Sequence, residues 1–428
     1  MSVKTETFVS YPSLIVMAAI SLLSLFHPDP SIPKMATKPL AVLNKAYKMQ
    51  VPYELKQGQT RLFHQLPSGL NMEVIEQKGL VLEDKENNGG PRNSERNPPL
   101  VFVHGSYHAA WCWAEHWLPF FSGFGFDSYA VSLLGQGESD APASPVAGSL
   151  QTHAGDVADF IQKKLTFPPV LLGHSFGGLI IQCYVANIRN KQTLEKKMRY
   201  PDLAGAVLVC SVPPSGNSGL VWRYLFSKPV AAFKVTRSLA AKAFQTNLSL
   251  CKETFFTSTM DDHLVKRYQA LMKESSRMPL FDLRKLNSSL PVPSVPKSSI
   301  EVLVLGANDD FIVIVIVSYD YGDFVVFLYP NKRAGYVVYI VKCHAWRESN
   351  LRNYSSTISV LLTPSDPSIL YSKPDPILGN DTEGLNETGR FYGVSPICVE
   401  GVAHDMMLDC SWEKGARAIL SWLNCLSR

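Results

Sequence analysis

The chain has 428 residues, of which 46% are hydrophobic and 18% are charged, a composition typical of a globular protein with one large core and an accessory part. The formal net charge of +4 is small for this length and no basic block stands out, so we expect no nucleic-acid partner. The eight cysteines show no Cys-x-x-Cys spacing, which favours free thiols in a reducing compartment and argues against a metal site such as zinc.

Residues 1–60 precede most of the expected core and are interpreted as an N-terminal extension. Residues 1–35 are rich in serine and poor in acidic residues, which favours a chloroplast transit peptide, although arginine is absent. The apolar segment 13–26 is short for a membrane span. A signal peptide or membrane anchor at 13–26 and a disordered extension of a cytoplasmic protein stay open, as do membrane association and oligomeric state.

Short apolar runs then alternate with helix-like stretches along the chain. Strands are expected at 61–66, 70–76, 100–103, 128–133, 169–172, 204–210, 301–305 and 395–399, and helices at 150–164 and 178–188. Continuous apolar runs are typical of parallel strands, whose sheet is covered by helices on both faces. The sequence therefore predicts an α/β fold with a mostly parallel sheet.

Residues 213–298 interrupt this alternation, because they show helical periodicity and contain no convincing buried strand. Paired hydrophobic residues such as Val221-Trp222 and Phe255-Phe256 recur along the segment. Since most connections between strands are much shorter, we predict a helical cap inserted between two strands. An ordinary run of crossover helices is the alternative.

The segment Gly173 to Gly177 reads Gly-His-Ser-Phe-Gly and lies between a predicted strand and a predicted helix. A sharp strand-to-helix turn needs small flanking residues, because a side chain there would collide with neighbouring backbone. The central serine of such a turn is strained and presents its Oγ to solvent. This context predicts Ser175 as a nucleophile, whereas His174 is expected to point elsewhere.

A nucleophilic serine needs a base and a carboxylate that orients the base. His404 is the candidate base, since a histidine on the loop after strand 395–399 can reach over the rim of the sheet; a surface histidine is the alternative. Asp309 and Asp310 follow another buried strand, and two adjacent aspartates cannot both point at one histidine. A carboxylate followed by x-Ile-Val resembles the usual setting of the acid in folds with such a nucleophile turn, which favours Asp310, and Asp309 stays open.

The developing oxyanion needs hydrogen-bond donors, and the backbone N–H of Phe176, directly after the nucleophile, is one. The second is expected from the loop after His104-Gly105, at the N–H of Ser106. Gly105 permits close approach of this loop, and His104 is expected to brace it by hydrogen bonding.

Five segments together resemble the α/β-hydrolase fold: 101–113, 133–140, 171–178, 302–313 and 401–408. The pattern His-Gly-x-x-His-x-Ala-Trp-Cys-Trp is similar to that of plant methyl esterases, hydroxynitrile lyases and bacterial lysophospholipase-like hydrolases. The resemblance covers 100–423 except 314–380 and implies an eight-stranded sheet, a cap over the site and no cofactor. The order Ser175, Asp309 or Asp310, His404 is the order of this topology. The resulting division is a core of 61–212, 299–313 and 381–428, with the cap at 213–298.

These residues and the resemblance predict a serine hydrolase that cleaves a carboxylic ester. Ser175 attacks the acyl carbon, His404 takes and returns the proton, Asp310 orients His404, and water hydrolyses the acyl-enzyme. The apolar cap favours a lipid-like ester or a small-molecule methyl ester as substrate. Two alternatives stay open: a hydroxynitrile-lyase-type lyase on the same triad, and a non-catalytic ligand-binding protein of the fold.

Residues 314–380 depart from the resemblance, because they are rich in Tyr, Val, Ile, Phe and Ser and match neither a helix nor a clean hairpin. Asp310 and His404 are 94 positions apart, and without these 67 residues they would be 27 apart, a normal spacing for one helix and one strand. Translated U-rich non-coding sequence has this composition. We interpret the segment as a retained intron or a gene-model artefact, with a genuine surface insertion as the alternative.

Overall fold

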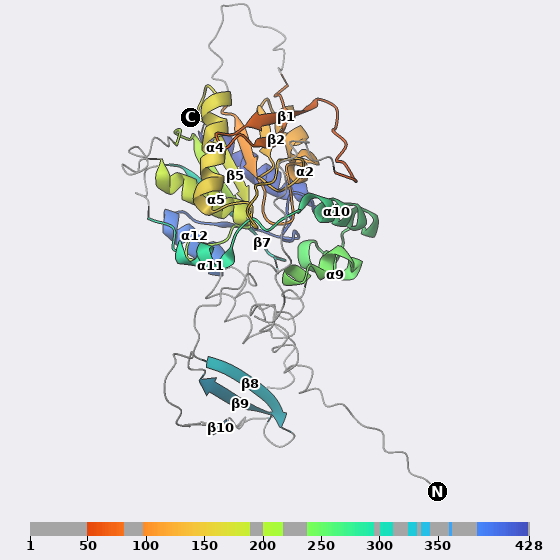
Figure 1. The fold of residues 1–428 in the computed structure, drawn as a ribbon, viewed down its shortest axis with the longest axis vertical. Coiled ribbons are helices and arrows are strands. Elements are labelled where there is room, and N and C mark those ends of the chain that lie inside the picture. Colours follow the sequence, from red (N-terminus) through yellow and green to blue (C-terminus); the bar gives the residue numbers. More distant parts are fainter. Residues whose placement is uncertain are drawn as a thin grey trace, which may run out of the picture. The chain divides into compact units, whose positions relative to one another are not determined.

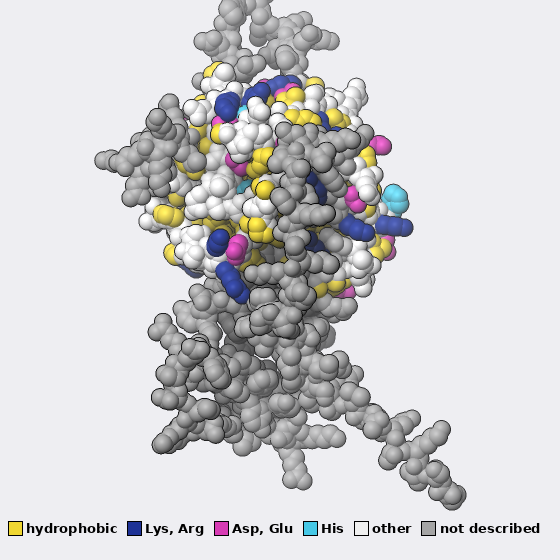
Figure 2. Space-filling view, viewed as in Figure 1, with side chains coloured by type: hydrophobic (Ala, Val, Ile, Leu, Met, Phe, Trp, Pro, Cys, Tyr) yellow, Lys and Arg dark blue, Asp and Glu magenta, His cyan; other side chains and the backbone are white. Residues whose placement is uncertain are grey.

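The computed structural model describes residues 49–80, 97–188, 200–216, 238–294, 300–310, 324–331, 335–342, 359–361 and 383–426. The predicted transit peptide, the apolar segment 13–26 and most of 314–380 lie outside these residues. No described helix combines the length and apolar character needed to span a membrane. On the described part of the face shown in Figure 2, basic, acidic and apolar side chains are interspersed.

The chain divides into two compact units, one made of 46–319 and 376–428, the other of 1–45 and 320–375. The described part of the second unit is an antiparallel sheet of β8 (Phe324–Asn331), β9 (Gly335–Lys342) and β10 (Ser359–Leu361) in the order β10-β9-β8. Asn331 pairs with Gly335, so β8 and β9 form a hairpin. The expectation that 314–380 contains no clean hairpin is therefore wrong, since its β-branched and aromatic residues favour strand pairing.

The larger unit is built on an eight-stranded sheet in the order β1-β2-β4-β3-β5-β6-β7-β11. Figure 1 labels β1, β2, β5 and β7 of this sheet. Its strands are β1 (Gln59–Gln65), β2 (Asn71–Gln77), β3 (Leu100–Val103), β4 (Ser128–Val131), β5 (Val170–His174), β6 (Gly205–Val209), β7 (Val302–Ala307) and β11 (Ile397–Val399). β2 pairs antiparallel with β1 and β4, and the other neighbours are parallel. The predicted eight-stranded, mostly parallel sheet is confirmed.

The described helices of this unit connect the strands and follow the last one. They are α2 (Trp111–Ala114), α3 (Trp117–Gly123), α4 (Leu150–Lys164), α5 (Phe176–Asn187), α9 (Leu248–Phe255), α10 (Asp262–Ser275), α11 (Leu283–Ser288), α12 (Glu383–Tyr392) and α13 (Trp412–Leu426), with a 3-10 turn at Ala243–Gln245. The predicted helix 150–164 coincides with α4, whose start is capped by Ser149 and Thr152 in a reciprocal pair of hydrogen bonds. The described part of 213–298 contains α9, α10 and α11.

Residues of the central strands alternate between two apolar cores, because successive side chains of a strand point to opposite faces of the sheet. In β3, Phe102 belongs to one core, while Val101 and Val103 belong to the other. The first core includes residues of α2, α3 and α13, and the second residues of α4 and α5. Helices on both faces of the sheet are therefore confirmed.

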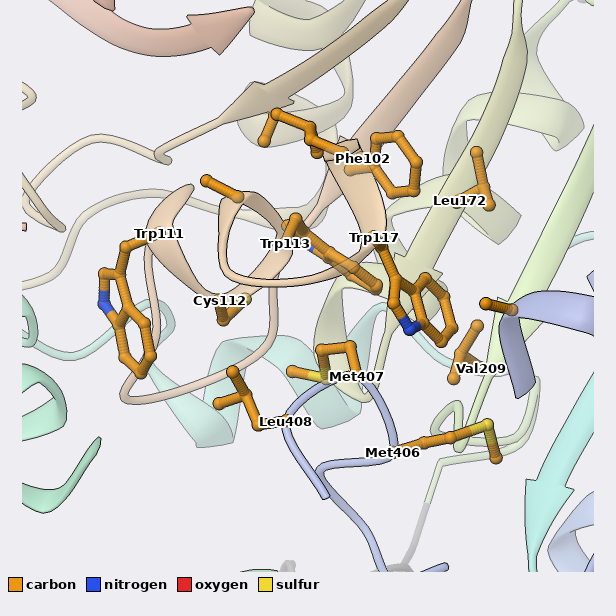
Figure 3. Packing of buried hydrophobic residues seen from close by; sticks show 14 of the residues in the cluster. Phe102, Trp111, Cys112, Trp113, Trp117, Leu172, Val209, Met406, Met407 and Leu408 are labelled. Atoms are coloured by element: carbon orange, nitrogen blue, oxygen red, sulfur yellow. The ribbon is translucent and has the colours of Figure 1, made fainter. Parts of the chain in front are cut away.

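The first core also anchors the segment 406–408 that follows His404 and Asp405. Met406, Met407 and Leu408 are fully buried, and Figure 3 shows them among tryptophans of α2 and α3 and side chains of the strands. Parallel strands β3, β5, β6, β7 and β11 end at the same edge of the sheet, where ligand sites of open α/β sheets lie. The loops that carry Ser106, Ser175, Cys210, Asp310 and His404 all follow these strand ends.

Candidate active site

Ser175 lies in a sharp turn between β5 and α5, with φ 54° and ψ −118°, a region that non-glycine residues rarely adopt. Its N–H donates to the carbonyl of Val209 at 3.0 Å, which holds the turn on β6. A Cβ on Gly173 would lie 2.6 Å from the backbone of Gly177, and one on Gly177 would lie 2.3 Å from the carbonyl oxygen of Val103. The predicted strand–turn–helix context is confirmed, together with the steric reason for its two glycines.

His404 and Asp310 form a buried pair, with Nδ1 of His404 2.9 Å from each carboxylate oxygen of Asp310. Because a carboxylate accepts hydrogen bonds, Nδ1 carries the hydrogen and Nε2 of the neutral ring is free to take a proton. Asp309 is half-buried and its carboxylate accepts a hydrogen bond from the Asn308 side chain at 3.4 Å. The structure thus brings Asp310, rather than Asp309, to His404.

The electrostatic surroundings of His404 favour its charged form. Burial alone opposes an imidazolium, but the charge of Asp310, the hydrogen bond to Asp310 and the charge of Asp405 outweigh burial and raise the pKa of His404. A raised pKa in a ring whose Nε2 is free is the property expected of a base that forms an imidazolium during a reaction.

Cys210, which sequence reasoning missed, also contacts Asp310. Burial, followed by the nearby Asp310 carboxylate, raises the pKa of Cys210 well above its usual range, so the thiol stays protonated and hydrogen-bonds the carboxylate. Its φ of 43° lies in the left-handed region. The signal that could have found it is its position directly after β6, at the edge where the other loops meet.

The loop after β3 approaches the turn at Ser175 closely. A Cβ on Gly105 would lie 2.9 Å from the Cβ of Ser175 and 3.0 Å from the carbonyl oxygen of His174. Ser106 follows Gly105 directly and is therefore carried to the same place. Phe176 is the first residue of α5, where backbone N–H groups lack partners within the helix and the helix dipole favours negative charge.

His104 braces this loop, as expected from its position. Its Nδ1 donates to the carbonyl of Gly105 at 2.7 Å, and its Nε2 accepts from the N–H of Leu133 at 3.0 Å. Burial lowers the pKa of His104 to about 3, so the ring is neutral and uses both nitrogens to hold backbone. The bonds connect the loop after β3 to the loop after β4.

Helices of the predicted cap pack against the next residue of the loop, Tyr107. Its ring centroid is 4.9 Å from that of Phe244 and 6.4 Å from that of Phe255, and its hydroxyl donates to the carbonyl of Leu239 at 3.0 Å. Tyr107 has φ 67°, which a non-glycine residue adopts only where its surroundings hold it. Residues within 213–298 thus support the loop that carries Ser106.

His174 was expected to point elsewhere, but its ring lies beside the proposed site. Its ring centroid lies 4.6 Å from that of His404, and its Nε2 donates to the carbonyl of His404 at 3.0 Å. The expectation was wrong because the loop after β11 passes beside the end of β5, a proximity that the chain order does not reveal. Asp405 and His108, also missed, lie in the same buried region.

Comparisons with known proteins concern the family and the fold of the chain. A model of the alpha/beta hydrolase family matches residues 100–327, more than half of the chain. Epoxide hydrolase 2 of Siraitia grosvenorii is 30% identical over 83 residues, 19% of this chain and 26% of that protein. A non-heme chloroperoxidase of Streptomyces lividans is 34% identical over 125 residues, 29% of this chain and 40% of that protein. The chain thus matches less than half the length of either relative.

Among solved structures, an epoxide hydrolase from Vigna radiata superposes with a TM-score of 0.50 at 15% identity, over 86% of this chain and 98% of that one. A likeness at this identity concerns the fold. The fold, the turn at Ser175 and the length of the family match lead to one conclusion: the chain belongs to the alpha/beta hydrolase family.

Proposed function

We propose that this protein is a serine hydrolase that cleaves a carboxylic ester. The observation that carries the proposal is a strained, tightly held Ser175 at the sheet edge where the hydrogen-bonded pair of His404 and Asp310 also lies. Acyl transfer from an ester needs a nucleophile, a base that can return the proton, and a carboxylate that orients the base. These three side chains supply those roles.

In this mechanism the Ser175 hydroxyl attacks the ester carbon while Nε2 of His404 takes its proton. Asp310 stabilises the imidazolium, and the N–H groups of Ser106 and Phe176 stabilise the oxyanion. Collapse of the tetrahedral intermediate expels the alcohol, which receives the proton from His404 and leaves an acyl group on Ser175. Water then attacks the acyl-enzyme by the same steps, and the carboxylic acid and free serine are released.

The names of the similar proteins raise epoxide opening as another chemistry, and the residue at position 175 argues against it. A carboxylate that opens an epoxide forms an ester, which water can cleave. A serine that did so would form an alkyl ether, which resists hydrolysis under mild conditions. Ser175 therefore favours acyl transfer, where its covalent intermediate is an ester.

The substrate class is inferred from the aromatic surroundings of the site. Phe176 packs against Phe281 with ring centroids 5.3 Å apart, and Tyr107 packs against Phe244 and Phe255. Aromatic side chains beside a site favour binding of apolar ligand groups. We therefore propose a hydrophobic or methyl-ester substrate, small or lipid-like, and no cofactor.

The proposal is tested by trapping the acyl-enzyme. Purified protein is mixed with a panel of methyl and p-nitrophenyl esters and with one slowly hydrolysed ester, quenched, digested and examined by mass spectrometry. We expect turnover with a burst and an acyl adduct on the peptide that contains Ser175. Labelling of Ser175 by a fluorophosphonate without any acyl adduct would instead support a lyase. Neither turnover nor labelling across the panel would support a ligand-binding protein.

The pH dependence of kcat/KM should show a base with a raised pKa. Because His404 must be neutral to act, activity should rise with pH along a limb whose midpoint lies above the ~6.5 of free imidazole. Measurements between about pH 5 and pH 9 at constant ionic strength locate this midpoint. A midpoint at or below that of free imidazole would contradict the role of Asp310.

The same raised pKa contributes to folding stability with the opposite pH dependence. The stabilisation of the His404 imidazolium by Asp310 is fully present below the pKa that His404 has in the unfolded chain. It is lost as pH rises through the higher pKa of the folded state. The pH range in which this contribution disappears is therefore the range in which activity appears.

We also propose that residues 314–380 are foreign to the hydrolase unit, as a retained intron or gene-model artefact would be. The support is that elements on either side of the segment meet directly: β7 pairs in parallel with β11, with Leu305 opposite Ile397. Leu385 of α12 packs on Gly306 of β7: a Cβ added to Gly306 would lie 2.7 Å from Cδ2 of Leu385. The core therefore has a consistent path without the intervening residues.

Deleting 314–380 should raise soluble yield and ester turnover per milligram. The physical reason is that the segment begins four residues after Asp310, whose position controls the tautomer of His404. A variant in which 314–380 is replaced by a Gly/Ser linker of equal length separates the effect of composition from that of length. Unchanged or lower activity in both variants, or a dominant transcript that encodes the segment, would favour a genuine insertion.

A further inference from the structure

A second imidazole–carboxylate cluster lies directly beside the proposed catalytic groups. It consists of His108, His174 and Asp405, none of which is more than 1% exposed. His108 Nε2 is 3.0 Å from one carboxylate oxygen of Asp405, and His174 Nε2 is 3.8 Å from the other. His174 and Asp405 are the immediate chain neighbours of Ser175 and His404, respectively.

Hydrogen bonds at the far side of each ring locate the protons of the cluster. Nδ1 of His108 lies 2.8 Å from the carbonyl oxygen of Ser106, which can only accept, so Nδ1 carries a hydrogen. If that ring were neutral and Asp405 charged, two acceptors would face each other at 3.0 Å in a buried site. A proton must therefore lie between His108 and Asp405, on one or the other, and the pair is neutral overall.

His174 does not supply this proton. Its Nε2 donates to the carbonyl of His404, and burial, reinforced by the neighbouring His404, lowers the pKa of His174 well below its usual range. Its ring is therefore neutral, with the hydrogen on Nε2. Nε2 of His108 and both oxygens of Asp405 have no well-directed hydrogen bond among the described residues, so their close contact has the character of an ion pair.

Each imidazole of the cluster holds one loop of the proposed site. His108 binds the Ser106 carbonyl and so fixes the turn through Tyr107, whose φ is 67°. His174 binds the carbonyl of His404. Asp405 lies between the two rings, and its own N–H donates to the carbonyl of Phe255 at 3.0 Å.

The carboxylate that joins these loops is itself held rigidly. Figure 3 shows the residues that follow Asp405, Met406 to Leu408, inserted among Trp111, Trp113 and Trp117 of the first core. Rigid support of this kind limits how far a site residue can move, and a displacement of about 1 Å can cost about 100-fold in rate.

We propose that Asp405 is a positioning residue that shares one buried proton with His108. Through this proton it holds the loop that carries Ser106 and the loop that carries His404 in place beside Ser175. The proposal rests on the ester hydrolase function proposed above. Asp405 and His108 act through Ser106 and His404 and contact no substrate.

A metal ion is the competing occupant of this place, since ligand atoms of the three residues all lie within 4.8 Å of one another. His174 Nε2, the ring nitrogen that lies 3.8 Å from Asp405, has no lone pair to offer a metal, because it bears the hydrogen donated to His404. A metal would also replace the proton between His108 and Asp405. The hydrogen bonds observed on the far sides of the rings therefore favour the proton.

The test compares Asp405→Asn with Asp409→Asn, a matched control in the same loop. Asp409 is equally buried, but its carboxylate accepts hydrogen bonds from the backbone N–H and hydroxyl of Thr257, away from the cluster. We expect Asp405→Asn to lower kcat about 10- to 100-fold with KM changed little, and Asp409→Asn to affect stability alone. The double variant His108→Gln with Asp405→Asn should cost no more than the larger single loss, because both residues act as one unit.

The pH profile gives a readout that a purely structural role would not move. Asp405 helps to raise the pKa of His404, so its neutralisation should shift the acid limb of kcat/KM to lower pH. The titratable groups that face Asp405 are His108, His174, His404 and the thiols of Cys112, Cys210 and Cys251. Burial first, and then Asp405 among other causes, raises the pKa of each of these thiols, so they stay neutral over the range measured.

Nuclear magnetic resonance of the wild-type protein tests the shared proton even where a variant fails to fold. We expect a low-field imidazole N–H resonance that is assigned to His108 by its loss in His108→Gln. Absence of that resonance would overturn the proposal of a shared proton. So would one equivalent of a divalent metal that copurifies with the wild type and is lost in Asp405→Asn. Equal kcat in Asp405→Asn and Asp409→Asn, with an active wild type, would overturn the positioning role and leave the ester hydrolase intact. An inactive wild type would instead count against the proposed function.

Discussion

Alanine at position 175 should lower kcat for ester hydrolysis by about 10⁴- to 10⁶-fold, which leaves a rate about 10³- to 10⁴-fold above that of the uncatalysed reaction. Without the hydroxyl no acyl-enzyme forms, and only the oxyanion donors and substrate binding remain to accelerate attack by water. The backbone strain at φ 54° stays in the variant, because it is imposed by the β5–α5 turn and the hydrogen bond to Val209. The free energy of unfolding should therefore change little, and the loss can be assigned to chemistry.

Initial rates on the best ester of the panel, with the enzyme concentration determined by active-site titration of the wild type, measure this loss. Ser249→Ala, an exposed serine on α9, controls for contaminating esterases carried through purification. If Ser175→Ala keeps activity within about tenfold of wild type, the loss is far smaller than removal of a catalytic serine causes. That result would show that another residue is the nucleophile.

Asparagine at position 310 should lower kcat by about 10⁴-fold, the loss that the equivalent substitution produces in a serine protease. The asparagine amide can donate to Nδ1 of His404, which moves the ring hydrogen to Nε2 and removes the lone pair that Ser175 needs. The charge that outweighs burial and raises the pKa of His404 is lost at the same time. The acid limb of the residual activity should consequently shift to lower pH.

Asp309→Asn is the matched control for this prediction, since the two aspartates are adjacent but only Asp310 bonds His404. The control should retain activity within about twofold, as expected for a surface substitution that affects no buried partner. Steady-state kinetics on both variants, with thermal unfolding to confirm folding, decide between them. A large loss in Asp309→Asn and a small one in Asp310→Asn would reverse the assignment.

The core elements could be predicted because their signals are local. The apolar run Leu100–Val103 became β3 and the amphipathic stretch 150–164 became α4 with the same bounds. The hairpin of β8 and β9 was missed because weak alternation in a chain segment does not reveal which partner it will pair with.

In the candidate site, too, local features could be predicted and contacts between distant residues could not. The turn at Ser175 follows from residues within a few positions, because steric exclusion at Gly173 and Gly177 involves neighbouring backbone. The choice between Asp309 and Asp310 stayed open, since adjacent carboxylates are equivalent until a tertiary partner distinguishes them. The hydrogen bond to His404 supplies that distinction.

The amino-acid sequence by itself determined the mostly parallel sheet and the sharp strand-to-helix turn at Ser175, and it offered a histidine and two aspartates as candidate partners of Ser175. Only the tertiary structure decided that Asp310 bonds His404, that Cys210 bonds Asp310, and that His108, His174 and Asp405 gather behind them. The physical reason is that turn sterics act between neighbours along the chain. Contacts between side chains on different loops depend on the order in which β3, β5, β6, β7 and β11 lie in the sheet.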